Sequence, residues 1–251
     1  MSSSFITNKE KFLSDIINGI LPKTDAVDIL VGYFYFSGYM QLSEKLKDKQ
    51  IRILVGLDAD LHITNYIREV EAIRSKFVSR NAIKEEYYKQ FVRLFNDSDF
   101  LDTAEKLEQF KMFYGKILDG TLEIRKTLEP CHSKMYLFAY NNMMNEDGEL
   151  PGVLITGSSN LSYQGLKGRL ELNARFNDKQ DYEEGIRIFD ELWDTSVAVV
   201  DKDNLDEWNT KVMAHIWYDK IYSPYLMYVR VLKEYFNIPS SDNILTPYDI
   251  T

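Results

Sequence analysis

The feature that most constrains the fold is a strand–helix–strand pattern near the N-terminus. The apolar, β-rich run VDILVGYFYF (27–36) is followed by GYMQLSEKLKDK and then by a second apolar run, IRILVGL (51–57). An amphipathic segment, NKEKFLSDIINGIL, precedes the first run. Two apolar runs joined by a segment of helical character are typical of parallel strands with a crossover helix. The pattern predicts an α/β domain.

Four further strands are predicted downstream. They are LEIRKTL (122–128), HSKMYLFAY (132–140), GVLITGSS (152–159) and LELNARF (170–176). Between Leu57 and Tyr114 there is neither Gly nor Pro, and apolar residues recur there at helical spacing. Helical periodicity also covers 181–195 and most of 204–237. We expect a mixed β-sheet flanked by helices, with a helical insertion at about 61–120 and C-terminal helices.

Length and composition suit one soluble domain. We expect a single domain over 1–238 and a linker over 239–251, because the last residues are turn-rich and polar; a missing downstream domain would then follow. No run reaches the roughly 18 apolar residues of a membrane span, and the N-terminus lacks the layout of a signal peptide. The single cysteine, Cys131, fits a reducing compartment and a buried apolar role. These observations favour a cytoplasmic protein without a membrane partner.

The net charge of −9 is concentrated in one part of the chain. Between Asp178 and Glu207 there are eleven acidic and three basic residues. Around the later strands the balance is mildly positive, with Lys167, Arg169 and Arg175 against Glu171. Such a run is most often a solvated surface, and the overall charge therefore does not exclude a polyanionic partner.

Polar residues occur at the ends of three consecutive predicted strands. If 132–140 is extended throughout, His132 and Lys134 project to one side, about 7 Å apart. The next strand ends in Gly157-Ser158-Ser159-Asn160. In the third, Glu171 lies between leucines that we expect to face the core, where a carboxylate needs a partner. Taken alone, a His-x-Lys can occur by chance and GSSN can be an ordinary turn or helix cap.

Together, His132-Ser133-Lys134, Gly157-Ser158-Ser159-Asn160 and Glu171 resemble the signature of the phospholipase D superfamily. One departure is Ala139, at the position where the family usually has Asp; several nuclease branches lack this Asp too. The chain layout, including GYFYFSGY and LTPYDIT, also resembles the phospholipase-D-like domains at the N-terminus of some bacterial superfamily 2 helicases and in restriction endonucleases. The resemblance is specific over about 122–176.

The resemblance implies a metal-independent phosphodiesterase without a cofactor. A neutral imidazole can attack phosphorus, and a second imidazole can protonate the leaving oxygen. Lys134 and the Asn160 amide can hold the phosphoryl oxygens, with Ser158 assisting. Glu171 can accept the other ring N–H of His132. These five residues are the predicted catalytic set, and none is a metal ligand.

This chemistry needs two histidines, and the chain has only one His-x-Lys. The other two, His62 and His215, lack the motif and are expected to be structural. A homodimer that places two copies of His132 across its axis would complete the site, with the helical insertion or the C-terminal helices as possible contacts. The leading hypothesis is a DNA nuclease domain, and the chain layout suits the N-terminal part of a helicase or restriction protein. The alternatives are a catalytically silent module that binds DNA or dimerises and, more distantly, a phospholipase or phosphatidyl transferase.

Overall fold

A computed structural model describes residues 4–57, 79–95, 103–141, 150–216 and 232. Its centre is one eight-stranded sheet with the strand order β1-β7-β6-β5-β2-β3-β4-β8. The strands are β1 (Phe5–Ile6), β2 (Thr24–Val31), β3 (Gln50–Val55), β4 (Leu122–Lys126), β5 (Met135–Tyr140), β6 (Gly152–Gly157), β7 (Asn173–Phe176) and β8 (Val197–Val200). Strands β2, β3 and β4 are parallel, whereas β5, β6, β7 and β1 continue the sheet antiparallel and β8 closes the other edge antiparallel.

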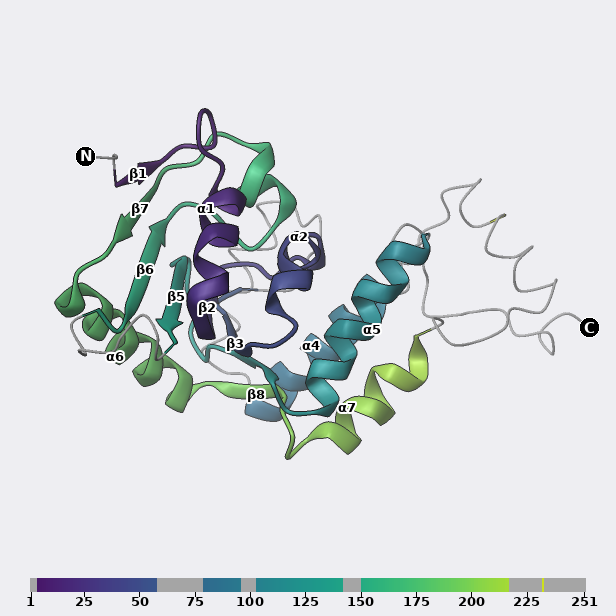
Figure 1. The fold of residues 1–251 in the computed structure, drawn as a ribbon. Helices are drawn as coiled ribbons and strands as arrows, with labels where there is room; N and C mark the ends of the chain where they lie inside the picture. Colours follow the sequence, from purple (N-terminus) through teal and green to yellow (C-terminus); the bar gives the residue numbers. More distant parts are fainter. Residues whose placement is uncertain (1–3, 58–78, 96–102, 142–149, 217–231, 233–251) are drawn as a thin grey trace, which may run out of the picture.

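Helices cover both faces of this sheet (Figure 1). The α-helices are α1 (Leu13–Ile20), α2 (Phe36–Leu46), α4 (Arg80–Phe95), α5 (Ala104–Leu118), α6 (Lys179–Thr195) and α7 (Leu205–Lys211), and the short turns are η1 (Leu21–Lys23), η3 (Gln164–Gly168) and η4 (Met213–His215). Helix α2 connects the parallel strands β2 and β3, as the first sequence pattern predicts. The mixed sheet flanked by helices is confirmed.

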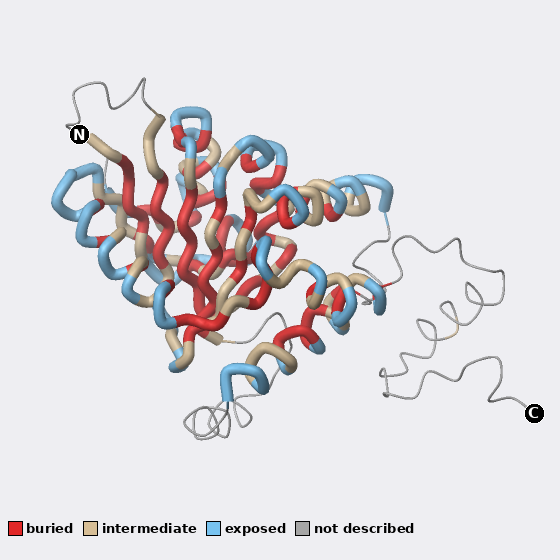
Figure 2. The backbone as a smooth tube through the Cα atoms, turned by 90° about the horizontal axis from the view of Figure 1, so that it is seen from below, coloured by how far each residue is buried: buried red, intermediate tan, exposed pale blue. Residues whose placement is uncertain are grey.

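Alternating strand residues supply two separate hydrophobic cores. On strand β5, Tyr136 and Phe138 join the larger core, to which helices α1, α2, α4 and α5 contribute. Met135 and Leu137 of the same strand join a smaller core beneath α6. The two-residue period of a strand explains this division, since successive side chains point to opposite faces. Figure 2 shows the central strands buried between helices whose outer surfaces are exposed.

The first predicted strand is too long at its C-terminal end. Strand β2 ends at Val31, and Phe36 already begins helix α2. The backbone leaves the sheet at Gly32: the Tyr33 amide donates to Asn160 Oδ1 (3.1 Å), and Phe34 makes an isolated bridge with Leu161. Apolar character continues through this turn because the Phe34 ring is buried against aromatic rings of α4 and α5.

The helical predictions are confirmed where the structure describes the chain. Helices α4 and α5 lie within the expected insertion, and α6 contains the predicted helix 181–195. Residues 58–78, most of the C-terminal segment after 216 and the expected linker 239–251 lie outside the described residues. Strands β1 and β8 were not predicted, since two to four residues carry too little periodicity to be recognised. No helix among the described residues is long and apolar enough to span a membrane.

Candidate active site

The predicted site residues gather at one edge of the sheet. This edge carries the C-terminal ends of β2, β3 and β6 and the N-terminal ends of β5 and β7, because β5 and β7 run against the others. Lys134 immediately precedes β5, Ser158 immediately follows β6, and Glu171 lies two residues before β7. The alternating strand directions therefore bring together three segments that are separate in sequence.

The segment with His132 and Lys134 is a loop and not the start of a strand. Strand β5 begins at Met135, opposite Leu30, and its neighbour β2 ends one residue later at Val31, so residues 132–134 have no β2 partner. On the other side the Gly157 amide still donates to the Lys134 carbonyl (3.3 Å). The prediction of a strand from 132 was therefore wrong, and His132 is exposed while Lys134 is half-buried.

Close backbone contact with strand β3 positions this loop. The Cys131 amide donates to the Gly56 carbonyl (3.1 Å). A Cβ atom at position 56 would lie 1.8 Å from the Cys131 carbonyl oxygen, so only glycine fits there. Cys131 itself is partly buried against the smaller core, in agreement with its predicted apolar role.

A buried hydrogen-bond network fixes the Gly157–Asn160 loop. Asn173 is 1% exposed; its Nδ2 donates to Ser159 Oγ (2.9 Å), and its Oδ1 accepts from the Ser159 amide (3.3 Å). The Tyr136 hydroxyl donates to the Ser159 carbonyl (3.0 Å). Burial, with a smaller contribution from the Glu171 carboxylate, raises the pKa of Tyr136 far above its usual value, so the hydroxyl remains a donor. The loop is therefore held by its second serine, which leaves Ser158 and Asn160 available to the site.

Lys134 and Asn160 meet beside the end of strand β2. A Cβ atom built on Gly32 would lie 3.3 Å from Asn160 Oδ1 and 3.5 Å from Lys134 Nζ, so both polar groups approach the same point. Lys134 Nζ donates to the His132 carbonyl (2.5 Å), which ties the ammonium group to the loop that carries the histidine. Burial lowers the pKa of Lys134, while Cys131 and Glu171 oppose this shift. The site thus contains a partly desolvated cation next to an amide.

Glu171 faces the site, but its neighbours do not face the core. Leu170 is 67% exposed and Leu172 is 57% exposed, which contradicts the prediction that they are buried. The reason is that residues 170–172 run beyond the end of β6, where the Ser158 amide donates to the Leu172 carbonyl (3.1 Å). The Ser158 hydroxyl donates to Glu171 Oε2. Within the described chain, the predicted bond from His132 to this carboxylate is not formed.

Ala139 lies away from the site. It pairs with Ala26 and Gly152, toward the far end of strand β5, and five residues of strand separate it from Lys134 by about 16 Å. Because successive residues of a strand face opposite sides of the sheet, Ala139 and Tyr136 also lie on opposite faces. A side chain at this position does not contact the predicted catalytic residues, so the replacement of the usual Asp leaves the local geometry of the site unchanged.

Sequence reasoning missed the residues that support the site. Asn173 and Tyr136 hold the loop after β6, and Gly32 leaves room for Lys134 and Asn160. A polar residue inside an apolar strand, such as Asn173 or Tyr136, is a weak signal that a buried hydrogen-bond partner exists. The spacing of the sequence does not show that this partner is Ser159. His215 lies at the end of η4, beyond α7 and strand β8 at the far side of the sheet, and His62 lies outside the described residues.

Comparisons with solved structures find low sequence identity and partial coverage. The phosphatidylserine synthase of Haemophilus influenzae is 13% identical over 93% of this chain and 44% of its own, with a TM-score of 0.48. Nuc from Salmonella typhimurium is 10% identical over 73% of this chain and 88% of its own (TM-score 0.38). NucT from Helicobacter pylori is 9% identical over 77% and 96% (TM-score 0.40). The polyphosphate kinase of Porphyromonas gingivalis is 10% identical over 76% of this chain and 22% of its own (TM-score 0.35), so the chain spans less than half of two of these proteins.

Among curated proteins no match is found. A family model does match: the model described as "Cardiolipin synthase, PLD-like domain" covers residues 23–193, more than half of the chain. This range contains both sequence motifs, Glu171 and six of the eight strands. The chain therefore belongs to the PLD-like domain family of the phospholipase D superfamily.

Proposed function

We propose that this chain is a metal-independent phosphodiesterase, a DNA nuclease domain that uses His132 as the nucleophile in a homodimeric active site. Membership of the PLD-like family supports phosphodiester chemistry at the family level. The observation that carries the proposal is the approach of Lys134 Nζ and Asn160 Oδ1 to one point beside Gly32, next to an exposed His132. Asn160 Oδ1 accepts from the Tyr33 amide (3.1 Å), so the donors offered to a phosphate are the Lys134 ammonium group and Asn160 Nδ2. Such donors can stabilise the negative charge that develops on phosphoryl oxygens.

The proposed reaction has two steps. In the first, the imidazole of His132 attacks phosphorus, and the bond to the leaving oxygen breaks as this oxygen takes a proton from the imidazolium of a second copy of the chain. In the second, water attacks the phosphohistidine, gives a proton to the now neutral second imidazole and releases His132. Lys134 and Asn160 hold the non-bridging oxygens in both steps, and Ser158 connects this group to Glu171.

The need for a second copy follows from the count of histidines. His132 is the only histidine of the chain with a Lys two residues later, and His215 lies beyond strand β8. A two-fold axis close to the exposed His132 would bring two imidazoles to opposite sides of one phosphorus atom. In this dimer the Glu171 carboxylate could accept a hydrogen bond from His132 only if the exposed imidazole changed its position.

DNA as the substrate, a cytoplasmic location and a fused helicase domain remain parts of the proposal that rest on the sequence. The single His-x-Lys motif and Ala139 in place of the usual Asp resemble the nuclease branches of the superfamily, which favours nucleic acid over lipid. The acidic excess lies between Asp178 and Glu207, on α6, α7 and the segments that flank β8. Two of its carboxylates, Asp181 and Glu184, line a hollow with Ser133 and Thr156, so the positive charge of the site is local to Lys134.

The first test is cleavage of labelled single- and double-stranded DNA in excess EDTA. The wild-type protein is expected to cleave, and His132→Ala is expected to be inactive. His215→Ala is the matched control, because it removes an exposed histidine outside the site and should cleave as the wild type does. Cleavage that appears only with added metal contradicts the mechanism. DNA that is bound but not cleaved by the wild type would instead favour the silent binding module.

The dimer is tested by mixing chains. Wild type and His132→Ala are co-expressed in known ratios with different affinity tags, and the activity of the mixture is measured. If one site needs two histidines, activity falls as the square of the wild-type fraction. A linear dependence would show that each chain cleaves alone, and the homodimeric site would then be wrong.

A further inference from the structure

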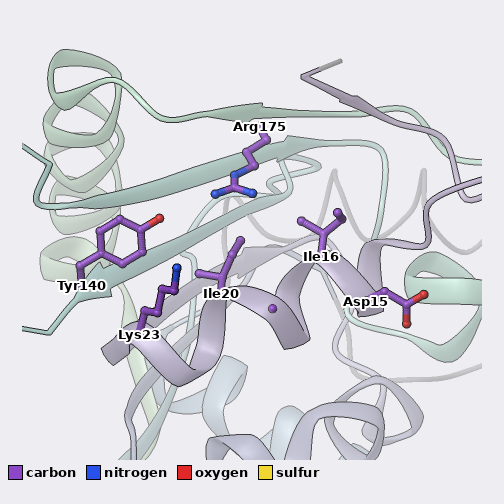
Figure 3. Close-up of a pocket in the computed structure, with 7 residues that line it drawn as sticks. Asp15, Ile16, Ile20, Lys23, Tyr140 and Arg175 are labelled. Carbon is purple, nitrogen blue, oxygen red and sulfur yellow. The ribbon is translucent and has the colours of Figure 1, made fainter. Parts of the chain in front are cut away.

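A second polar hollow lies away from the candidate active site (Figure 3). It has a volume of about 240 Å³ and is lined by Asp15, Ile16, Gly19, Ile20, Lys23, Tyr140 and Arg175. Helix α1 and the turn η1 form one side, and strands β5 and β7 form the other. Six residues of chain separate Lys134 from Tyr140 along strand β5, which corresponds to about 20 Å. The hollow is therefore separate from the site that contains Lys134.

The charge of this hollow is unusual for the protein. The chain has a net charge of −9, and the other large hollow, about 340 Å³ beneath α6, carries the carboxylates of Asp181 and Glu184. By contrast, the hollow beside α1 is lined by two cations, Lys23 and Arg175. Within the described residues neither cation forms an ion pair.

The backbone holds the polar groups of the hollow in place. Tyr140 pairs with Thr24, and the Asn141 amide donates to the Lys23 carbonyl (2.9 Å), so the Lys23 and Tyr140 backbones are adjacent. Arg175 Nε donates to Asn177 Oδ1 (2.8 Å), which orients the guanidinium group and leaves its two terminal amino groups to the hollow. Figure 3 shows the Arg175 and Lys23 side chains pointing toward one another, with the Tyr140 hydroxyl beside them.

We propose that Lys23, Arg175 and Tyr140 form a second binding site for a phosphate group. Two cations that point into one space repel each other unless an anion lies between them. Asp15, the only carboxylate of the lining, lies on the far side of Ile16 in Figure 3. A guanidinium fork binds two oxygens of a tetrahedral oxyanion, and an ammonium group and a phenol can bind the others. The volume is below the roughly 300 Å³ of typical small-molecule sites, so it suits a phosphate group rather than a whole cofactor.

Calorimetric titration with inorganic phosphate tests the site. All proteins carry Lys134→Gln, so that binding at the candidate active site does not contribute. Arg175→Gln and Lys23→Gln are each expected to lower the affinity for phosphate about tenfold, the typical loss for a charge-assisted hydrogen bond. Arg93→Gln is the matched control: Arg93 is exposed on α4, and its loss should leave binding unchanged. Tyr140→Phe, which preserves the ring, should weaken binding less.

The source of the phosphate is identified by two further titrations. A DNA oligonucleotide with a 5′-phosphate and the same oligonucleotide without it are compared in the Lys134→Gln protein with and without Arg175→Gln. If Arg175→Gln lowers the affinity for DNA tenfold, as well as the affinity for inorganic phosphate, the hollow is a site for strand phosphates. If it lowers only the affinity for inorganic phosphate, the hollow is a site for a free ligand. If the Lys134→Gln protein binds no phosphate, or if Arg175→Gln binds it unchanged with intact circular dichroism, the proposal is wrong. Neither result depends on cleavage, so the proposed nuclease activity is tested separately.

Discussion

The two sequence motifs that meet at the candidate active site are held in different ways. The Gly157–Asn160 loop is anchored by buried partners, since Ser159 is 0% exposed and bonded to Asn173 and Tyr136. The His132–Lys134 loop has a fixed backbone, but the imidazole of His132 is exposed and makes no bond to Glu171 in the described structure. The groups that would hold a phosphate, Asn160 and Lys134, are therefore positioned within one chain, whereas the imidazole that would attack it is left open. This difference is the expected one if the second half of the chemistry comes from another copy.

The sharpest test of this comparison is His132→Ala. Because the side chain is exposed, we expect the free energy of unfolding to change by less than about 0.5 kcal/mol. Because His132 is the proposed nucleophile, we expect cleavage to fall by about 10⁴-fold or more. Urea unfolding and single-turnover cleavage in EDTA measure the two quantities. A loss of stability above about 1 kcal/mol would show that the imidazole is part of the folded scaffold, and the comparison would fail.

Asn173→Ala should behave in the opposite way. The substitution leaves the buried Ser159 amide without its acceptor, which costs about 1–3 kcal/mol, whereas the Ser159 hydroxyl still donates to the Gly165 carbonyl (2.9 Å). Urea unfolding should show this loss of stability. Cleavage should fall less than in His132→Ala, because the displaced loop carries Ser158 and Asn160 and the nucleophile is kept. Asn81→Ala, on the exposed surface of α4, is the control and should change stability by less than about 0.5 kcal/mol. Equal stability of the two variants would mean that the network does not anchor the loop.

The same comparison explains what the sequence could predict. The strand alternation and the two motifs predicted the sheet and the gathering of polar residues at one edge, since both depend on neighbours along the chain. The end of β2 depends instead on a bond from the Tyr33 amide to Asn160, a separation of 127 residues, which no local pattern contains. The exposure of Leu170 and Leu172 likewise depends on where strand β6 ends. Local patterns thus predicted elements and their order, while long-range contacts determined their ends and the partner of Glu171.

Ser158→Ala gives a smaller and more specific effect. The Ser158 hydroxyl donates to Glu171 and accepts from the Leu172 amide (3.0 Å), so its removal frees the carboxylate without touching the buried network. We expect cleavage to fall about tenfold and stability to fall by no more than about 1 kcal/mol, the range for an exposed hydrogen bond. Ser158→Thr, which keeps the hydroxyl, should restore most of the activity. If Ser158→Ala cleaves as the wild type does, the contact with Glu171 has no role in positioning.

The smallest effect concerns pH and the positioned cation. Burial lowers the pKa of Lys134 below its ordinary 10.5, so its positive charge is lost at a lower pH than that of an exposed lysine. DNA binding by the inactive His132→Ala protein should therefore be strong below this pKa and weaken severalfold as the pH rises through it. In the double variant with Lys134→Arg the guanidinium stays charged, and binding should remain constant over the same range. Fluorescence anisotropy at fixed ionic strength measures both. Parallel pH profiles for the two proteins would show that the Lys134 ammonium does not contact phosphate, and the phosphate-holding half of the site would then have to rest on Asn160 and Ser158 alone.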